Sequence, residues 1–178
     1  YLGILPTLAS ILAFSIGLIV TGAMHEDGLA DCADGFGGGQ SKNQKLEIMR
    51  DSRIGSFGVL ALFFIVSARI VSLSNLPPNQ EVLFAVLALA MISRLVMVFY
   101  LTFLSPARDE GLGRGASKPE VGALVISVIT CIPIIFICGS YMISCVVIIA
   151  IIAFLFGWII RVQIGGQTGD TCGAAQLI

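Results

Sequence analysis

The residues most suited to chemistry form an acidic cluster that directly follows an apolar run. Asp27, Asp31 and Asp34 are spaced by four and then three residues, and Glu26 precedes them. In a helix with about 3.6 residues per turn the three aspartates share one stripe, with Asp27 and Asp34 only about 20° apart around the axis. Because like charges at these spacings repel one another, we expect a cation to bind them. The alternative is an acidic helix end that is hydrated and binds nothing.

The chemistry of the cluster favours Mg²⁺ as that cation. Its donors are hard oxygens, and Mg²⁺ binds through a few carboxylates and completes its shell with water and substrate phosphate. A calcium loop of the EF-hand type fits less well, because it needs oxygens at alternate positions and a Glu at the twelfth. Asp170 lies in a second polar block, GGQTGDTCGAA, that could add a ligand, bind phosphate or simply cap a helix. Glu26 could be a flanking ligand or a base.

Several residues could bind phosphate beside such a metal. Arg50 and Arg53, three apart on a predicted helix, could clamp a phosphate group. The glycine-rich segment 35–39 could bring backbone amides close to a phosphate, although a flexible linker is the commoner meaning of such a segment. Arg94 lies near the middle of an apolar run, where a cation usually faces a polar partner. It could hold a phosphate oxygen or form an ion pair with an acidic residue.

The composition indicates that a membrane positions these residues. Of 178 residues, 57% are hydrophobic and only 12% are charged, about half the charge of an ordinary soluble domain. The net charge of −1 excludes nucleic-acid binding by phosphate neutralisation. Nearly charge-free runs cover residues 1–24, 54–74, 82–104 and 121–160. We predict a single all-α domain over residues 1–178, a polytopic bundle of about five spans, with the last run divided near Gly139 and Ser140.

The charges between the runs predict an orientation. With five spans in order, the loops 25–53 and 105–120 and the segment from Arg161 onward fall on one side. Of the ten Lys and Arg residues, all but Arg69 and Arg94 lie there, and the opposite connections carry none. The positive-inside rule assigns that side, and the acidic cluster with it, to the cytoplasm. The chain starts within an apolar run without Met, so we expect a preceding N-terminal part to be missing.

Three motifs resemble one family in particular. HEDGLADCADG from His25, EIMRDSRIGSFG from Glu47 and GGQTGDTCGA from Gly165 closely resemble the cobalamin synthase family, also called adenosylcobinamide-GDP ribazoletransferase. The blocks stand in the family's order and the resemblance covers nearly the whole chain. Family members extend further at the N-terminus and somewhat beyond Ile178.

The resemblance implies a Mg²⁺-dependent multi-pass enzyme of the cell membrane, in contact with lipid, that acts in the last stage of vitamin B12 assembly. It would join adenosylcobinamide-GDP to α-ribazole, or to its 5′-phosphate, and release GMP. On this reading Asp27, Asp31 and Asp34 hold the metal, and Glu26 and Asp170 are further ligands or the base. Phosphate charge would be balanced by Arg50, Arg53 and Arg94. His25 is a second candidate base or a hydrogen-bonded neighbour.

Two other functions remain open at this point. CDP-alcohol phosphotransferases perform analogous chemistry with a DG-x2-AR signature, of which this chain has Asp27 and Gly28 but lacks the Ala-Arg pair, where it has Asp31 and Cys32. A cation transporter could also place acids beside membrane helices, but near the middle of the bilayer. The sequence decides neither between α-ribazole and its phosphate nor the oligomeric state.

Overall fold

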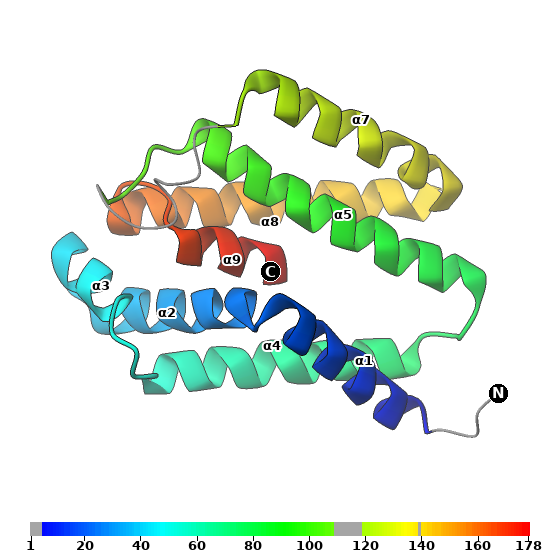
Figure 1. The fold of residues 1–178 in the computed structure, drawn as a ribbon, viewed down its shortest axis with the longest axis horizontal. Helices are drawn as coiled ribbons and strands as arrows, with labels where there is room; N and C mark the ends of the chain where they lie inside the picture. The colour runs from blue at the N-terminus through cyan, green and yellow to red at the C-terminus, as the bar shows by residue number, and fades with distance from the viewer. Residues whose placement is uncertain (1–4, 109–118, 139) are drawn as a thin grey trace.

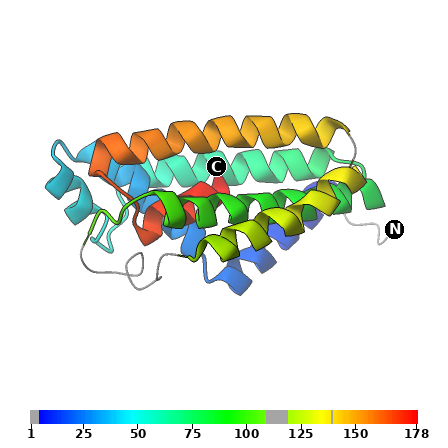
Figure 2. The ribbon, with the colours of Figure 1, turned by 90° about the horizontal axis from the view of Figure 1, so that it is seen from above.

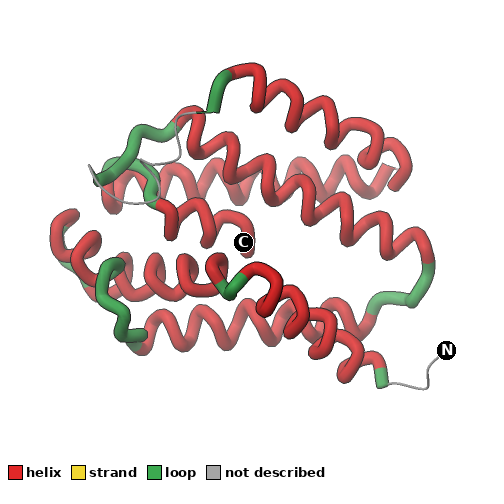
Figure 3. Tube along the Cα trace, in the orientation of Figure 1, coloured by secondary structure: helices red, strands yellow, loops and turns green. Residues whose placement is uncertain are grey.

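The chain folds into helices that run roughly along one common axis (Figures 1 and 2). The computed structural model describes residues 5–108, 119–138 and 140–178. Within these residues the only β-type pairing is an isolated bridge between Pro106 and Gln167, and Figure 3 shows helices and loops but no strand among them. The all-α class predicted from the sequence is confirmed. The helices are α1 Pro6–Thr21, α2 Met24–Gly38, α3 Lys42–Ile48, α4 Ser56–Asn75, α5 Gln80–Phe103, α7 Val121–Cys138, α8 Ser140–Ile164 and α9 Gly169–Leu177.

Three of the described helices are long and apolar enough to cross a membrane. They are α4, α5 and the Tyr141–Ile164 part of α8, and α1 with α2 forms a fourth candidate only as a bent pair. The sequence predicted about five spans. The difference arises because α1 has only 16 residues and the described apolar part of α7, Val121–Pro133, is also short. The predicted division of the last run near Gly139 and Ser140 is confirmed, because α7 ends at Cys138 and α8 begins at Ser140; Gly139 itself lies outside the described residues.

The first apolar run ends earlier than its hydropathy predicted. We expected a span through Met24, but α1 stops at Thr21 and the chain turns by 88° before α2 begins. Gly22 and Ala23 make this turn in the left-handed region, with φ of 62° and 54°. Glycine adopts that region at no steric cost, whereas alanine rarely does. The turn directs the acidic helix α2 between α4 and α9 (Figure 1).

The outer faces of the long helices are strongly apolar. Phe63 on α4 is 64% exposed, and Phe154 and Trp158 on α8 are 75% and 61% exposed. Contiguous apolar surface of this kind marks contact with a membrane or a partner. This apolar surface and the lengths of the helices indicate a multi-pass membrane protein.

The charged connections gather at one end of the bundle. The carboxyl ends of α2, α5 and α8 and the amino ends of α4 and α9 meet at the left of Figure 1, beside α3, and the α4–α5 connection lies at the opposite end. This is the alternation that the sequence predicted. Arg114 and Lys118, also expected at the charged end, lie outside the described residues.

Candidate active site

The site is built on a close contact between α2 and α9. Gly28 faces the start of α9 so closely that a Cβ atom there would lie 2.6 Å from the carbonyl oxygen of Asp170. At Gly173 a Cβ atom would lie 3.2 Å from the carbonyl oxygen of Met24. Small residues let membrane helices approach in this way. As a result the negative charge of Asp170, a residue 139 positions later in the chain, acts on Asp31 of α2. The charge of Asp27 acts on Asp31 as well.

The start of α9 is fixed by its cap and by the loop after α5. The Thr168 hydroxyl accepts a hydrogen bond from the Thr171 amide at 3.2 Å, and the Thr171 hydroxyl accepts one from the Thr168 amide at 2.8 Å. The predicted helix-cap role of this block is confirmed for the two threonines. Gln167 pairs with the loop: its amide donates to the Ser105 carbonyl and its carbonyl accepts from Ala107, both at 2.8 Å.

The pairing with Gln167 brings Arg108 to the start of α9. From the sequence, Arg108 was expected only as one of the positive charges of its loop. Nη2 of Arg108 lies 3.6 Å from Oδ2 of Asp170, an ion pair too long to be a hydrogen bond. The same nitrogen donates to the carbonyl of Leu46 at 3.1 Å. Burial raises the pKa of Asp170 against the opposing effect of Arg108, and burial lowers the pKa of Arg108. No local spacing could have indicated a pairing across 62 residues.

The donor set at this contact suits Mg²⁺. Among the described residues no three His, Cys, Asp or Glu side chains converge into a ready-made metal cage. Mg²⁺ does not need one, because it usually binds one or two carboxylates and keeps water and substrate phosphate as its other ligands. Asp27, Asp31 and Asp170 supply hard oxygens that repel one another, with Arg108 as the cation that acts on Asp31. The residues present therefore fit the ion.

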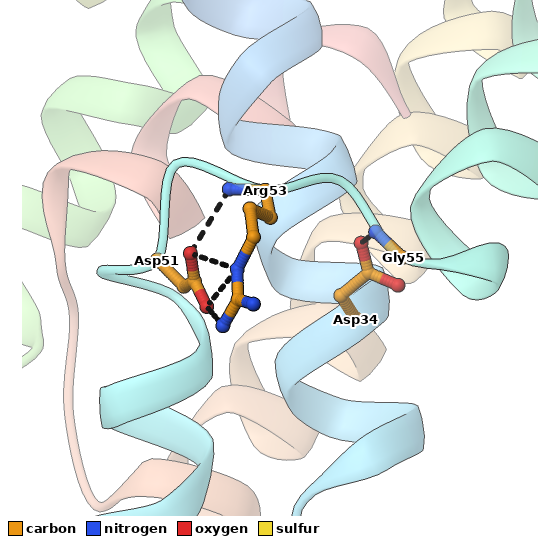
Figure 4. Close-up of polar contacts among 4 residues, drawn as sticks. All are labelled: Asp34, Asp51, Arg53 and Gly55. Carbon is orange, nitrogen blue, oxygen red and sulfur yellow. Dashed lines mark hydrogen bonds and ion pairs between the residues drawn. The ribbon is translucent and has the colours of Figure 1, made fainter.

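Asp34 turns to a different neighbour. Its carboxylate accepts hydrogen bonds from the Gly55 amide at 2.7 Å and from the Gly58 amide at 2.9 Å, and the residue is 8% exposed. It thus caps the amino end of α4 (Figure 4). Seven residues advance a helix by about 10.5 Å, so Asp34 shares the stripe of Asp27 but not its position along the axis. Gly55, the N-cap residue of α4, has no side chain that could accept these hydrogen bonds. A glycine directly before a predicted helix was therefore the one sign in the sequence that another residue caps α4.

The predicted arginine pair is not on one helix. Helix α3 ends at Ile48, so Arg50 and Arg53 both lie in the connection to α4. Arg53 forms an ion pair with Asp51 at 2.6 Å, and its side chain is 88% exposed (Figure 4). Arg50 lies close enough to Arg108 for its charge to act there.

The glycine-rich segment is not the loop that we expected. Helix α2 continues through it to Gly38, so its first glycines are helical. A Cβ atom on Gly35 would lie 2.5 Å from Cγ of Met49, and one on Gly37 would lie 2.7 Å from the ring of Phe57. These glycines therefore serve close packing against the connection to α4 and its first turn.

The remaining predicted residues line a cavity of about 730 Å³ that is bordered by α1, α4, α5, α8 and the end of α9. His25 and Glu26 lie along it with Arg69 and Arg94. Nδ1 of His25 and Oε2 of Glu26 are buried and have no hydrogen-bond partner in the part of the chain that the structure describes. Arg69 donates to the carbonyl of Leu177 at 3.0 Å. Arg94 donates to the carbonyl of Ala90 in its own helix at 2.8 Å. His25 also borders the contact between α2 and α9, because a Cβ atom on Gly173 would lie 3.4 Å from the Cα atom of His25.

Comparison with known proteins points to one family. Residues 1–178 match the family model described as cobalamin-5-phosphate synthase. The adenosylcobinamide-GDP ribazoletransferase of Mesorhizobium japonicum is 41% identical over 171 residues, which is 96% of this chain and 66% of that protein. The protein of the same name from Azorhizobium caulinodans is 41% identical over 187 residues, 98% of this chain and 69% of its own. The chain thus spans about two thirds of the length of these relatives. No solved structure matches the chain.

Proposed function

Because the chain belongs to the cobalamin-5-phosphate synthase family, whose model covers residues 1–178, we propose that it joins adenosylcobinamide-GDP to α-ribazole or its 5′-phosphate. GMP is the other product. The observation that carries this proposal is the match over the whole chain to a family of that activity. The acidic contact between α2 and α9 supports it, because transfer at a diphosphate needs positioned charge more than covalent help from the protein.

Asp27, Asp31 and Asp170 are the proposed ligands of Mg²⁺, whereas Asp34, the fourth ligand predicted from the sequence, caps α4 with both of its carboxylate oxygens. When bound, Mg²⁺ would neutralise the negative charge of the diphosphate. The protein's own contribution is to hold the carboxylates on two helices that pack rigidly through Gly28 and Gly173. Such fixed placement of the reacting groups is the larger part of catalysis in phosphoryl transfer.

The reaction is a displacement at phosphorus. The ribose hydroxyl oxygen of α-ribazole bonds to the corrinoid-linked phosphorus, the bond from that phosphorus to the GMP oxygen breaks, and a base accepts the hydroxyl proton. Glu26, His25 and Asp170 are the proposed candidates for the base. The candidacy of Glu26 and His25 is supported by Oε2 and Nδ1, which have no hydrogen-bond partner among the described residues. Arg50, Arg53 and Arg94 are the predicted partners of phosphate charge.

We further propose that the charged end of the bundle faces the cytoplasm. Lys42, Lys45, Arg50, Arg108 and Arg161 belong to connections or helix ends there, while the 76–79 connection at the opposite end carries no Lys or Arg. The positive-inside rule supports this orientation. The acidic site would then open to water-soluble substrates in the cytoplasm, and the apolar faces of α4 and α8 would contact lipid.

A substrate comparison tests the proposed function. The protein in proteoliposomes with Mg²⁺ is given α-ribazole and either adenosylcobinamide-GDP or CDP-diacylglycerol, and nucleotide release and the corrinoid product are measured by chromatography. We expect GMP and a cobalamin product in equal amounts from the first mixture and no CMP from the second. Release of CMP instead would support a CDP-alcohol phosphotransferase. Cation flux without either product would support a transporter.

A further inference from the structure

We propose that Arg108 binds a phosphate oxygen of the diphosphate substrate, together with Arg50, and is therefore a substrate-binding residue outside the family-like motifs. The inference rests on the proposed function and deepens it. Its starting point is the placement of Arg108 beside Asp170 in the loop that follows α5, with a side chain only 14% exposed.

The guanidinium of Arg108 has donors to spare. Of its five N–H groups, one at Nη2 is bonded to the carbonyl of Leu46. Nε is buried and has no hydrogen-bond partner among the described residues, and the carboxylate of Asp170, at 3.6 Å, is beyond hydrogen-bonding distance. An edge of the guanidinium that includes Nε can bind two oxygens of one phosphate in parallel. A rotation of the side chain that exposes this edge would let an incoming phosphate supply the acceptor that Nε lacks.

The positive charge of Arg50 favours an anion at the same place, whereas the charges of Asp31 and Asp170 favour the cation of the proposed metal site. Arg50 acts on Arg108 as a neighbouring positive charge, and two guanidinium groups brought close together are stabilised by an anion between them. On the other side, the charges of Asp31 and Asp170 act on Arg108, so the phosphate would lie next to the proposed metal ligands. Arg50, Arg108 and the metal ion would then all bind the same diphosphate group.

The other predicted phosphate-binding residues lack this combination. Arg53 is bound to Asp51 and points into solvent, and Arg94 bonds within its own helix. Arg108, in contrast, follows directly after the pairing of Ser105 and Ala107 with Gln167. That pairing fixes the backbone that carries Arg108 against the start of α9. The structure therefore assigns the phosphate contact to Arg108 and Arg50.

The test uses Arg108→Lys, which keeps the charge and removes the two-point geometry. Arg161→Lys is the matched control, because Arg161 is an exposed cation at the same end of the bundle. Binding of adenosylcobinamide-GDP in the absence of α-ribazole is measured by calorimetry, and kcat and KM are measured for both substrates. We expect Arg108→Lys to weaken that binding and raise the KM for adenosylcobinamide-GDP by roughly 10- to 100-fold. The KM of Arg108→Lys for α-ribazole should equal that of the wild type. The Arg161→Lys variant should match the wild type in binding, kcat and KM.

Arg50→Ala provides a second variant, since Arg50 is exposed in a connection and its loss should not disturb folding. It should also weaken binding of adenosylcobinamide-GDP. If Arg108→Lys lowers only the melting temperature or kcat, and both variants bind like the wild type, Arg108 is a structural residue and the inference is overturned. If the wild-type protein itself neither binds nor converts adenosylcobinamide-GDP, the proposed function fails, and the inference with it.

Discussion

Replacement of Asp31 by asparagine is expected to abolish group transfer while membrane insertion and folding stay intact. Asp31 is the aspartate of α2 on which the charges of Asp27, Asp170 and Arg108 all act, so it lies at the centre of the proposed metal site. A metal ion supplies several kcal/mol of charge stabilisation in the transition state. Because each 1.36 kcal/mol is a factor of ten in rate, we expect a loss of roughly three orders of magnitude in GMP release.

Glu81→Gln is the matched control for Asp31→Asn. It makes the same change from carboxylate to amide, but Glu81 is exposed in the first turn of α5, at the opposite end of the bundle. Its variant should release GMP at the wild-type rate. Insertion of both variants is checked by their recovery in the membrane fraction, and folding by their melting temperatures. Near-normal GMP release by Asp31→Asn would contradict its assignment as a metal ligand.

The second large effect is expected from Gly28→Ala, a change that adds a single methyl group. That group would lie 2.6 Å from the carbonyl oxygen of Asp170 and 3.0 Å from its Cα atom, and neither backbone atom can move unless α9 moves. Overpacking of this kind costs about 1–3 kcal/mol. A displacement of about 1 Å between reacting groups can cost about 100-fold in rate. We therefore expect a lower melting temperature and roughly 100-fold slower transfer.

Gly17→Ala separates this effect from a general effect of alanine in a helix. A Cβ atom at Gly17, in α1, would meet nothing within 4 Å, and alanine favours the helix by about 1 kcal/mol over glycine. The Gly17 variant should be as stable as the wild type or more so, with unchanged transfer. Wild-type activity and stability in Gly28→Ala would show that α2 and α9 are not in the close contact described here.

The local parts of the site could be predicted from the sequence, and the long-range parts could not. The stripe of Asp27, Asp31 and Asp34 follows from helical periodicity, and α2 contains all three. Helical periodicity, however, gives only the angular position of a side chain around the axis. It does not say which neighbouring element packs against each turn of the helix. Asp34 therefore caps α4, although its angular position predicted a place beside Asp27.

The partners of α2 depend on contacts that no local pattern encodes. Hydropathy located the apolar runs but not the turn at Gly22, which needs a positive φ rather than a change in polarity. Nor did the loop charges distinguish Arg108 from its neighbours, because its place beside Asp170 follows from the backbone pairing with Gln167. The depth of Arg94 in an apolar run predicts a polar partner, and the structure places Arg94 along the cavity with His25 and Glu26. Its contact with phosphate stays a prediction.

We propose that the carboxylates between α2 and α9 hold a Mg²⁺ ion on which transfer depends. The most direct test is a titration of Mg²⁺ into EDTA-treated proteoliposomes that contain the protein, adenosylcobinamide-GDP and α-ribazole, with GMP release as the readout. We predict no release in EDTA and a saturable recovery with added Mg²⁺. In Asp170→Asn, which alters the α9 side of the contact, recovery should need a much higher Mg²⁺ concentration. Full GMP release in EDTA, or the same Mg²⁺ dependence in Asp170→Asn as in the wild type, would contradict the claim.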